Sequence, residues 1–167
     1  MTPHARAAAP SLAFGLLTVS DTRTAGDDAS GSTMSDLVEA AGHRVFERAI
    51  VRDEPEMIRE RILAWSADPA CDAVVSSGGT GFSGRDRTFE AAVSLFERKI
   101  DGFGELFRML SFQEIGSAAM LSRATAGVVR GTPVFLLPGA PGAVALGLTR
   151  LVLPEIGHIA GELRRRT

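Results

Sequence analysis

The chain has 167 residues, of which 45% are hydrophobic and 23% charged, a composition typical of a single globular domain with its own core. Its formal net charge of −2 gives no reason to expect nucleic acid binding, which requires a basic surface. Its one cysteine, Cys71, excludes an internal disulfide framework and a four-cysteine zinc site. We expect this thiol to be buried and the compartment to be reducing and cytoplasmic.

Residues 1–10 are rich in alanine and proline, and we expect them to form a flexible tail. They lack the long apolar segment of a signal peptide, and no later segment approaches the run of about 20 apolar residues that crosses a membrane. The sequence therefore predicts one domain over residues 11–167 and no membrane span.

Apolar runs and helical periodicities alternate along the rest of the chain. The expected strands are 12–19, 45–51, 73–76, 127–129 and 133–137. The expected helices surround Met34–Ala41, run from Asp53–Pro55 to Trp65, and cover 88–97, 102–115 and 143–163. Pro154 should kink or break the last of them. This order predicts an α/β fold with a mostly parallel sheet and helices on both faces.

Four polar or glycine-rich loops directly follow expected strands. They are 20–31, 51–54, 77–87 and 138–142. If those strands are parallel, the four loops meet at the carboxyl edge of the sheet, where open α/β sheets bind their ligands. The sequence therefore predicts a site at this edge.

The loop 77–87 is a phosphate-site candidate, because its glycines let bare backbone N–H groups approach an anion. Gly79–Gly84 spells the G-x-G-x-x-G dinucleotide motif, but two complete strand–helix units precede it and the motif normally lies in the first turn. The same glycines half-match a P-loop, yet Arg85 and Asp86 stand where Lys and Ser or Thr belong. A simple structural turn remains the alternative.

Asp86 would repel a phosphate in this loop unless a cation lay between them. Magnesium takes oxygen ligands from one or two carboxylates together with substrate phosphates, and Asp53 is a suitable second carboxylate. The alternatives stay open: Asp53 as the N-cap of its own helix, and Asp86 as a helix-terminal acid or the ion-pair partner of Arg85 or Arg87. The polar loop 20–31 could likewise serve only for capping and solvation.

Taken together, these segments resemble the MoaB/MogA family of molybdenum cofactor biosynthesis proteins. The matching pieces, in chain order, are Thr18–Arg23, Asp28-x-Ser30-Gly31, Asp53-Glu54, Ser77–Gly81, Arg85-Asp86, Gly102–Glu105, Leu121–Ala124 and Leu137–Gly142. The run Leu106–Phe112 is more similar to the MoaB branch than to the MogA branch. The resemblance covers nearly the whole chain beyond the tail, and it implies an α/β fold that binds molybdopterin.

Active members of this family adenylylate the terminal phosphate of molybdopterin with ATP and Mg²⁺, and the resemblance implies a role for each matching residue. Asp53 and Asp86 would be catalytic and would position magnesium or the reacting phosphates. The residues implied in substrate binding are Gly78, Gly79, Thr80 and Gly81 for phosphate, Ser20, Asp21, Asp28, Ser30 and Gly31 for the nucleotide, Ser122 for the pterin, and Glu105, Pro138 and Gly139 in the same cleft.

The family also implies a homo-oligomer, a trimer or a hexamer, and contacts with other proteins of the pathway. Apolar helix faces around Phe107 and Leu110 could supply the interface or belong to the core. Two other functions remain open. One is a non-catalytic pterin-binding scaffold of the same pathway. The other is a nicotinamide- or flavin-dependent oxidoreductase, which only the spelling of the glycine loop suggests.

Overall fold

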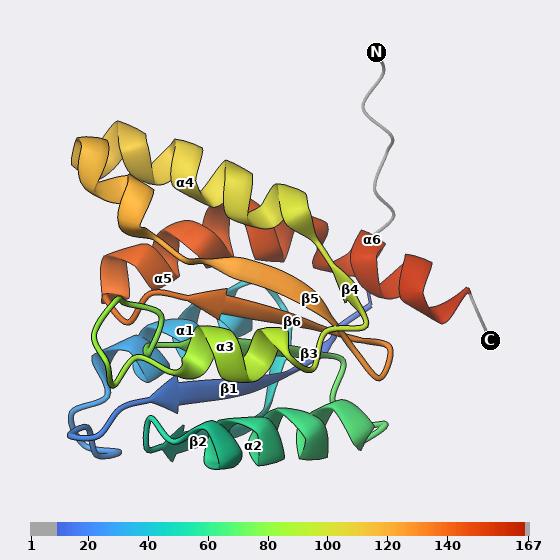
Figure 1. The fold of residues 1–167 in the computed structure, drawn as a ribbon. Coiled ribbons are helices and arrows are strands. Elements are labelled where there is room, and N and C mark those ends of the chain that lie inside the picture. Colours follow the sequence, from blue (N-terminus) through green and yellow to red (C-terminus); the bar gives the residue numbers. More distant parts are fainter. Residues whose placement is uncertain (1–9, 166–167) are drawn as a thin grey trace.

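Within residues 10–165, which the computed structural model describes, six strands form one sheet in the order β2-β1-β3-β6-β5-β4 (Figure 1). The expected tail, apart from Pro10, lies outside the described residues. The strands are β1 (Ala13–Val19), β2 (Arg44–Val51), β3 (Ala73–Ser77), β4 (Arg98–Lys99), β5 (Thr125–Val129) and β6 (Thr132–Leu137). The first three and β6 run parallel, whereas β5 is antiparallel to β6 and β4 to β5. The predicted fold class is confirmed.

Helices cover both faces of the sheet (Figure 1). They are α1 (Ala29–Ala40), α2 (Pro55–Ala67), α3 (Thr88–Val93), α4 (Asp101–Ile115), the 3₁₀ segment η1 (Gly116–Leu121), α5 (Pro141–Gly147), the π-helical segment η2 (Leu148–Val152) and α6 (Leu153–Arg164). One core joins α2 and α3 to the sheet through side chains such as Ile62 and Trp65. The other core joins α1, α4, α5 and α6 to the opposite face through Met34, Phe107 and Ile156.

The strand β1 shows why apolar runs predicted the sheet so directly. Phe14 and Leu16 enter the core under α1, α4 and α6, while Leu17 and Val19 enter the core under α2 and α3. Because successive side chains of a strand point to opposite faces, a strand covered on both sides is mostly apolar, and the one hydroxyl of β1, that of Thr18, donates to Asp28. All seven residues of β1 are buried.

The segment after the glycine loop differs from the predicted helix 88–97. The helix α3 ends at Val93, and the edge strand β4 follows at Arg98–Lys99. This short strand is held by its flanking backbone, since the Glu97 N–H donates to the Val128 carbonyl (2.9 Å) and the Ile100 N–H to the Ala126 carbonyl (2.8 Å). A strand of two exposed residues has no apolar alternation, so the sequence could not predict it.

The last helix neither breaks nor stops at Pro154. Helical structure continues from Pro141 to Arg164, and the wider turn of η2 ends at Val152, two residues before the proline. A proline lacks the N–H that would bond four residues back, and its ring crowds that carbonyl, so a π-turn at this place accommodates both defects.

This continuous helix corrects the expectation that no segment is long and apolar enough to cross a membrane. Its 24 residues, with a mean hydropathy of 1.3 over the most apolar window, reach that length and composition. Its apolar side chains nevertheless pack in the core, among them Val144, Leu148, Val152 and Ile156. Core helices of water-soluble domains pass the same test of length and composition.

Cys71 lies at the amino end of β3, and only 4% of it is exposed. Burial raises the pKa of its thiol to about 11, so the thiolate is scarce at neutral pH. The predicted burial of this cysteine is confirmed.

Candidate functional site

The parallel strands bring the predicted loops to one edge of the sheet. In the register, Val19 of β1 lies beside Val51 of β2, Thr18 beside Ser77 of β3, and Ser77 beside Leu137 of β6. The chain therefore leaves all four strands at the same level. Because β5 runs the other way, its first residue, Thr125, reaches the same edge beside Leu136 and brings Ser122 and Arg123 with it.

The glycine loop after β3 turns sharply over the end of β1. Gly78 and Gly79 have φ angles of +94° and +66°, which L side chains rarely adopt. A Cβ on Gly78 would lie 2.3 Å from the Val19 carbonyl oxygen, and one on Gly79 would lie 2.0 Å from the Thr88 Oγ1. Gly139, in the loop after β6, would place a Cβ 3.3 Å from the Gly78 Cα. Only glycines let these backbones approach so closely.

Four consecutive backbone donors of this loop are free. The Gly78 N–H donates to the Leu137 carbonyl (3.1 Å), but within residues 10–165 the N–H groups of residues 79–82 have no hydrogen-bond acceptor. Gly78 therefore supplies no free donor, and its lack of a Cβ lets the chain pass close to the Val19 carbonyl. A run of free N–H groups in a glycine-rich turn is a site for an anion.

Asp53, at the end of β2, does not cap its own helix, so the capping alternative is wrong. The N-cap position of α2 is Glu54, whose side chain makes no capping bond. The Asp53 Oδ1 instead accepts the Arg87 N–H (2.9 Å) at the start of α3. Burial raises the pKa of Asp53, as do the negative charges of Asp86 and Asp21, and together they outweigh the Arg87 N–H, which acts in the opposite direction.

Asp86 folds back onto its own loop. Its Oδ2 accepts the Ser83 N–H (2.8 Å), and a Cβ on Gly81 would lie 2.7 Å from the same oxygen. Among the described residues no ion pair joins Asp86 to Arg85 or Arg87, which removes that alternative.

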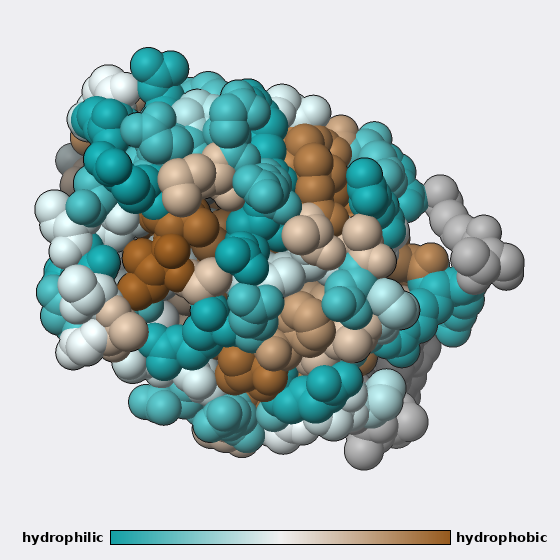
Figure 2. Space-filling model, turned by 90° about the horizontal axis from the view of Figure 1, so that it is seen from below, coloured by the Kyte–Doolittle hydropathy of each residue, from teal (hydrophilic) through white to brown (hydrophobic). Residues whose placement is uncertain are grey.

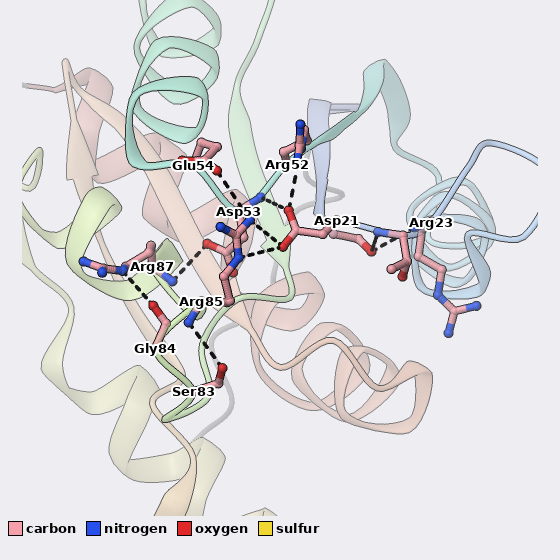
Figure 3. Close-up of polar contacts among 11 residues, drawn as sticks. Asp21, Arg23, Arg52, Asp53, Glu54, Ser83, Gly84, Arg85 and Arg87 are labelled. Atoms are coloured by element: carbon pink, nitrogen blue, oxygen red, sulfur yellow. Dashed lines mark hydrogen bonds and ion pairs between the residues drawn. The ribbon is translucent and has the colours of Figure 1, made fainter.

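Asp21 ties the loops after β1, β2 and β3 together (Figure 3). It accepts two hydrogen bonds from the Arg85 guanidinium, at 2.8 and 3.1 Å, and one from the Asp53 N–H at 3.2 Å. These hydrogen bonds, that of Arg85 above all, lower the pKa of Asp21, and the same pairing raises the pKa of Arg85. Arg85 also reaches Glu54 (3.4 Å), so it neutralises acids at the rim of the site.

The loop after β1 divides into structural and exposed parts. Asp28 is the N-cap of α1 and accepts the Gly31 N–H and the Thr18 hydroxyl, both at 2.9 Å. The Ser30 hydroxyl donates to the Gly139 carbonyl and so joins this loop to the one after β6. The capping alternative thus holds for Asp28, and Ser30 and Gly31 are buried.

Two hollows flank these loops. The larger, of about 680 Å³, is lined by Ser20, Asp21 and Asp28 together with basic side chains. Its arginines are Arg23, Arg48 and Arg52. The smaller, of about 390 Å³, lies between α4 and the segment before β5, and it brings Glu105 and Ser122 together with Lys99, Arg108 and Arg123. Glu105 and Ser122 therefore do not share a hollow with the residues of the loop after β1. Pro138 and Gly139 line neither hollow, and Gly139 lies against Gly78 of the glycine loop instead.

Sequence reasoning missed two residues at this edge. Arg123 donates hydrogen bonds to the carbonyls of the glycine loop, although the sequence indicated it only as part of a matching segment. The Thr88 hydroxyl is fully buried beside Gly79 and, within the described chain, has no hydrogen-bond partner. A hydroxyl two positions after Asp86, at the start of the helix, was the available signal for Thr88.

Comparison with known proteins shows the family of the chain. Residues 15–158 match the family described as MoCF_biosynth, "Probable molybdopterin binding domain". The chain belongs to this family. "Molybdenum cofactor biosynthesis protein B" of Bacillus subtilis (strain 168) is 48% identical over 151 residues, 90% of this chain and 89% of the relative. The protein of the same name from Escherichia coli (strain K12) is 41% identical over 141 residues, 84% and 83% of the two chains.

Solved structures place the chain in the same family. A crystal structure of molybdenum cofactor biosynthesis protein B has a TM-score of 0.91 at 46% identity and covers 93% of this chain and 98% of its own. The tungsten cofactor synthesizing protein MoaB from Pyrococcus furiosus has a TM-score of 0.84 at 35% identity with the same coverage. A MogA structure has a TM-score of 0.80 at 27% identity and covers 90% and 99% of the two chains. The resemblance to the MoaB/MogA family is confirmed, with the MoaB branch the more similar.

Proposed function

We propose that this molybdenum cofactor biosynthesis protein binds molybdopterin and adenylylates its terminal phosphate with Mg-ATP. The observation that carries the proposal is the run of four free N–H groups at residues 79–82, next to the buried carboxylate of Asp53. Free backbone donors suit phosphate oxygens. The pterin is inferred from the family, which is described as a probable molybdopterin binding domain.

The reaction needs no protein nucleophile. An oxygen of the pterin phosphate attacks the α-phosphorus of ATP, a new P–O bond forms, and the bond to the bridging oxygen breaks as pyrophosphate leaves with its electron pair. Catalysis of this kind rests on in-line positioning and on neutralising negative charge. The N–H groups of residues 79–82 would bind the charged oxygens, and the close packing of Gly78 and Gly79 against Val19 and Thr88 would hold the start of the loop in place.

The carboxylates fit a divalent cation. Asp53 is 7% exposed, its Oδ2 accepts no hydrogen bond from a described residue, and the charges of Asp86 and Asp21 raise its pKa. A bound cation would relieve this repulsion, and Asp53 and Asp86 are the residues that would hold it. Magnesium there would offset the negative charge of the reacting phosphates.

The two hollows offer places for the two substrates. We assign the nucleotide to the larger one, where Ser20, Asp21 and the arginine side chains lie. We assign the pterin to the smaller one, beside Ser122 and Glu105. Pro138, Gly139, Ser30 and Gly31 would support the cleft through the packed backbone rather than contact the ligands.

We further propose that the protein acts as a homo-oligomer, a trimer or a hexamer, in the cytoplasm with other proteins of the pathway. Phe107 and Leu110 belong to the core, at 1% and 9% exposure, so they cannot supply the interface. The opposite side of α4 and the segment η1 expose large apolar side chains. These are Leu106, Met109, Phe112, Ile115, Met120 and Leu121.

The decisive test incubates the purified protein with molybdopterin, ATP and Mg²⁺ and measures adenylylated pterin and pyrophosphate. We expect product from the wild type and a loss of about 100-fold or more in Asp53→Asn and Asp86→Asn, because each removes a charge from the site of transfer. The exposed Asp36→Asn on α1 is the matched control and should keep full activity.

Each other outcome points to a different function. Full activity in both variants would contradict the assigned carboxylate roles. Pterin binding without any product would favour the non-catalytic scaffold. Tight binding of NAD or a flavin without affinity for pterin would favour the oxidoreductase.

A further inference from the structure

Arg123 lies in the segment between η1 and β5, and its side chain is only 17% exposed although it is charged. Its Nε donates to the Thr80 carbonyl (2.9 Å), and its Nη2 donates to the carbonyls of Gly81 (2.5 Å) and Asp86 (3.5 Å). Its Nη1 pairs with Glu90 of α3. A single guanidinium therefore binds both ends of the glycine loop and the helix that follows it.

Two aromatic rings hold this guanidinium in place. Its central carbon lies 5.0 Å from the centre of the Phe82 ring and 4.9 Å from that of Phe89, so the cation interacts with both rings. Partial burial of Glu90 opposes its ionisation, but the Arg123 hydrogen bond and charge outweigh that effect and lower the Glu90 pKa. Phe89 and Glu90 belong to α3 and not to the glycine loop, so part of what orients Arg123 lies outside the loop that it contacts.

Because the peptide bond is planar, the contacts of Arg123 with loop carbonyls also restrict the direction of the neighbouring loop N–H groups. No peptide bond among the described residues is cis, and in a trans peptide the carbonyl and the N–H of the next residue point in opposite directions. The Thr80 and Gly81 carbonyls point at Arg123, so the N–H groups of Gly81 and Phe82 point away from it. Both belong to the free donors that form the proposed phosphate site.

Another trans peptide, between Asp86 and Arg87, connects Arg123 to Asp53. The carbonyl of the Asp86–Arg87 peptide accepts from Arg123 (3.5 Å), while its N–H donates to the Asp53 Oδ1 (2.9 Å). A shift of Arg123 would therefore rotate a peptide that holds the buried carboxylate.

We propose that Arg123 is a positioning residue that orients the free N–H groups of the glycine loop and, through the Asp86–Arg87 peptide, the carboxylate of Asp53. The inference rests on the proposed function for its effect on turnover, but its structural part concerns the protein without ligands. Arg123 also lines the smaller hollow beside Ser122, so it contacts both the glycine loop and the place assigned to the pterin. Lysine cannot replace it, because one ammonium cannot reproduce the planar array of donors or its stacking between two rings.

The test compares Arg123→Lys with Arg61→Lys. Arg61 also pairs with a glutamate, Glu47 (3.0 Å), and lies over an aromatic ring, Trp65 (5.4 Å), but it does not contact the loop. We expect hydrogen exchange at the Arg87 amide to become faster in Arg123→Lys and to stay at the wild-type rate in Arg61→Lys, at equal melting temperatures. In the adenylylation assay, kcat should fall by about 100-fold in Arg123→Lys only, while the Kd for molybdopterin stays near the wild-type value.

Unchanged exchange at the Arg87 amide in a folded Arg123→Lys protein would overturn the proposal. A loss of molybdopterin affinity equal to the loss of kcat would also overturn it, because Arg123 would then act by binding the pterin. If the wild type makes no product, the proposed function fails, yet the exchange measurement still decides the role of Arg123. Should Arg123→Lys not fold, Glu90→Gln keeps the guanidinium but removes its acid partner, and it should accelerate the same exchange to a smaller extent.

Discussion

At the scale of single residues, the candidate site holds carboxylates close to one another, although their mutual repulsion does not help the chain to fold. Asp53 is buried, and Asp86 and Asp21 raise its pKa further. A buried carboxylate with acidic neighbours destabilises the folded state, and such residues gather at functional sites. The Arg87 N–H compensates only in part. We interpret this residue as one that the fold retains for its chemistry.

The first prediction concerns the stability of Asp53→Asn. A carboxyl with a raised pKa binds its proton more tightly in the folded than in the unfolded chain, so the wild type loses unfolding free energy as pH rises from about 3.9 through the raised value. Asparagine does not titrate and still accepts the Arg87 N–H. Melting curves from pH 4 to pH 7 should therefore show that Asp53→Asn melts at or above the wild-type temperature, by a margin that grows with pH.

The exposed Asp36→Asn on α1 serves as the control for the loss of one carboxylate. A melting temperature of Asp53→Asn clearly below the wild type at pH 7 would show that the charge of Asp53 stabilises the fold.

At the scale of elements, the glycine loop is built from residues with different requirements. Gly79 needs a positive φ and lies against the Thr88 hydroxyl and the Asp53 Oδ2. Gly84, in the same loop, has an ordinary φ, and a Cβ there would meet no atom within 4 Å. The start of the loop, beside the Asp53 carboxylate, therefore requires glycine, whereas a side chain can be accommodated at Gly84.

The second prediction uses this contrast. Gly79→Ala should lower the unfolding free energy by at least about 1–2 kcal/mol, the cost of a left-handed residue with a Cβ, and should abolish adenylylation because the new methyl group displaces Asp53 or Thr88. Gly84→Ala should match the wild type in both respects. Chemical denaturation and the adenylylation assay measure the two effects, and an active, stable Gly79→Ala protein would contradict this account of the loop.

At the scale of the whole molecule, exposed apolar side chains gather on one element. Among the described residues, six of the eight exposed large hydrophobic side chains belong to α4 and η1, and the other two are Met57 and Phe82. The face seen from below, which carries α2, is largely hydrophilic, with its apolar side chains in small separate groups (Figure 2). Large apolar side chains gathered on one exposed part of a domain are typical of an interface.

The third prediction is that this surface mediates self-association. The double variant Met109→Glu, Phe112→Glu should reduce the native particle to a monomer in light scattering, because burying two carboxylates in an apolar interface is costly. Met57→Glu, a comparable change on α2, should leave the oligomer intact. A monomeric wild type, or an oligomer that survives the double variant, would exclude α4 as the interface.

Local sequence patterns determined the order of most elements and the edge at which the four polar loops meet. Strands buried on both faces are mostly apolar runs, and glycines and acids mark the loops that follow them, so both features are visible in the chain itself. The two-residue strand β4 carried no such signal, because it depends on neighbouring backbone rather than on a local pattern. The last helix was predicted over 143–163, but not that a π-turn would let it continue through Pro154.

The partners of each polar group were decided only by the tertiary structure. Asp53 could have capped its own helix, but packing gives it the N–H of Arg87, 34 residues away in the chain. Arg123 reaches the glycine loop because β5 runs antiparallel and returns the chain to the same edge. Hydrogen bonds join groups that are close in space, and closeness across distant segments follows from how the strands are ordered in the sheet.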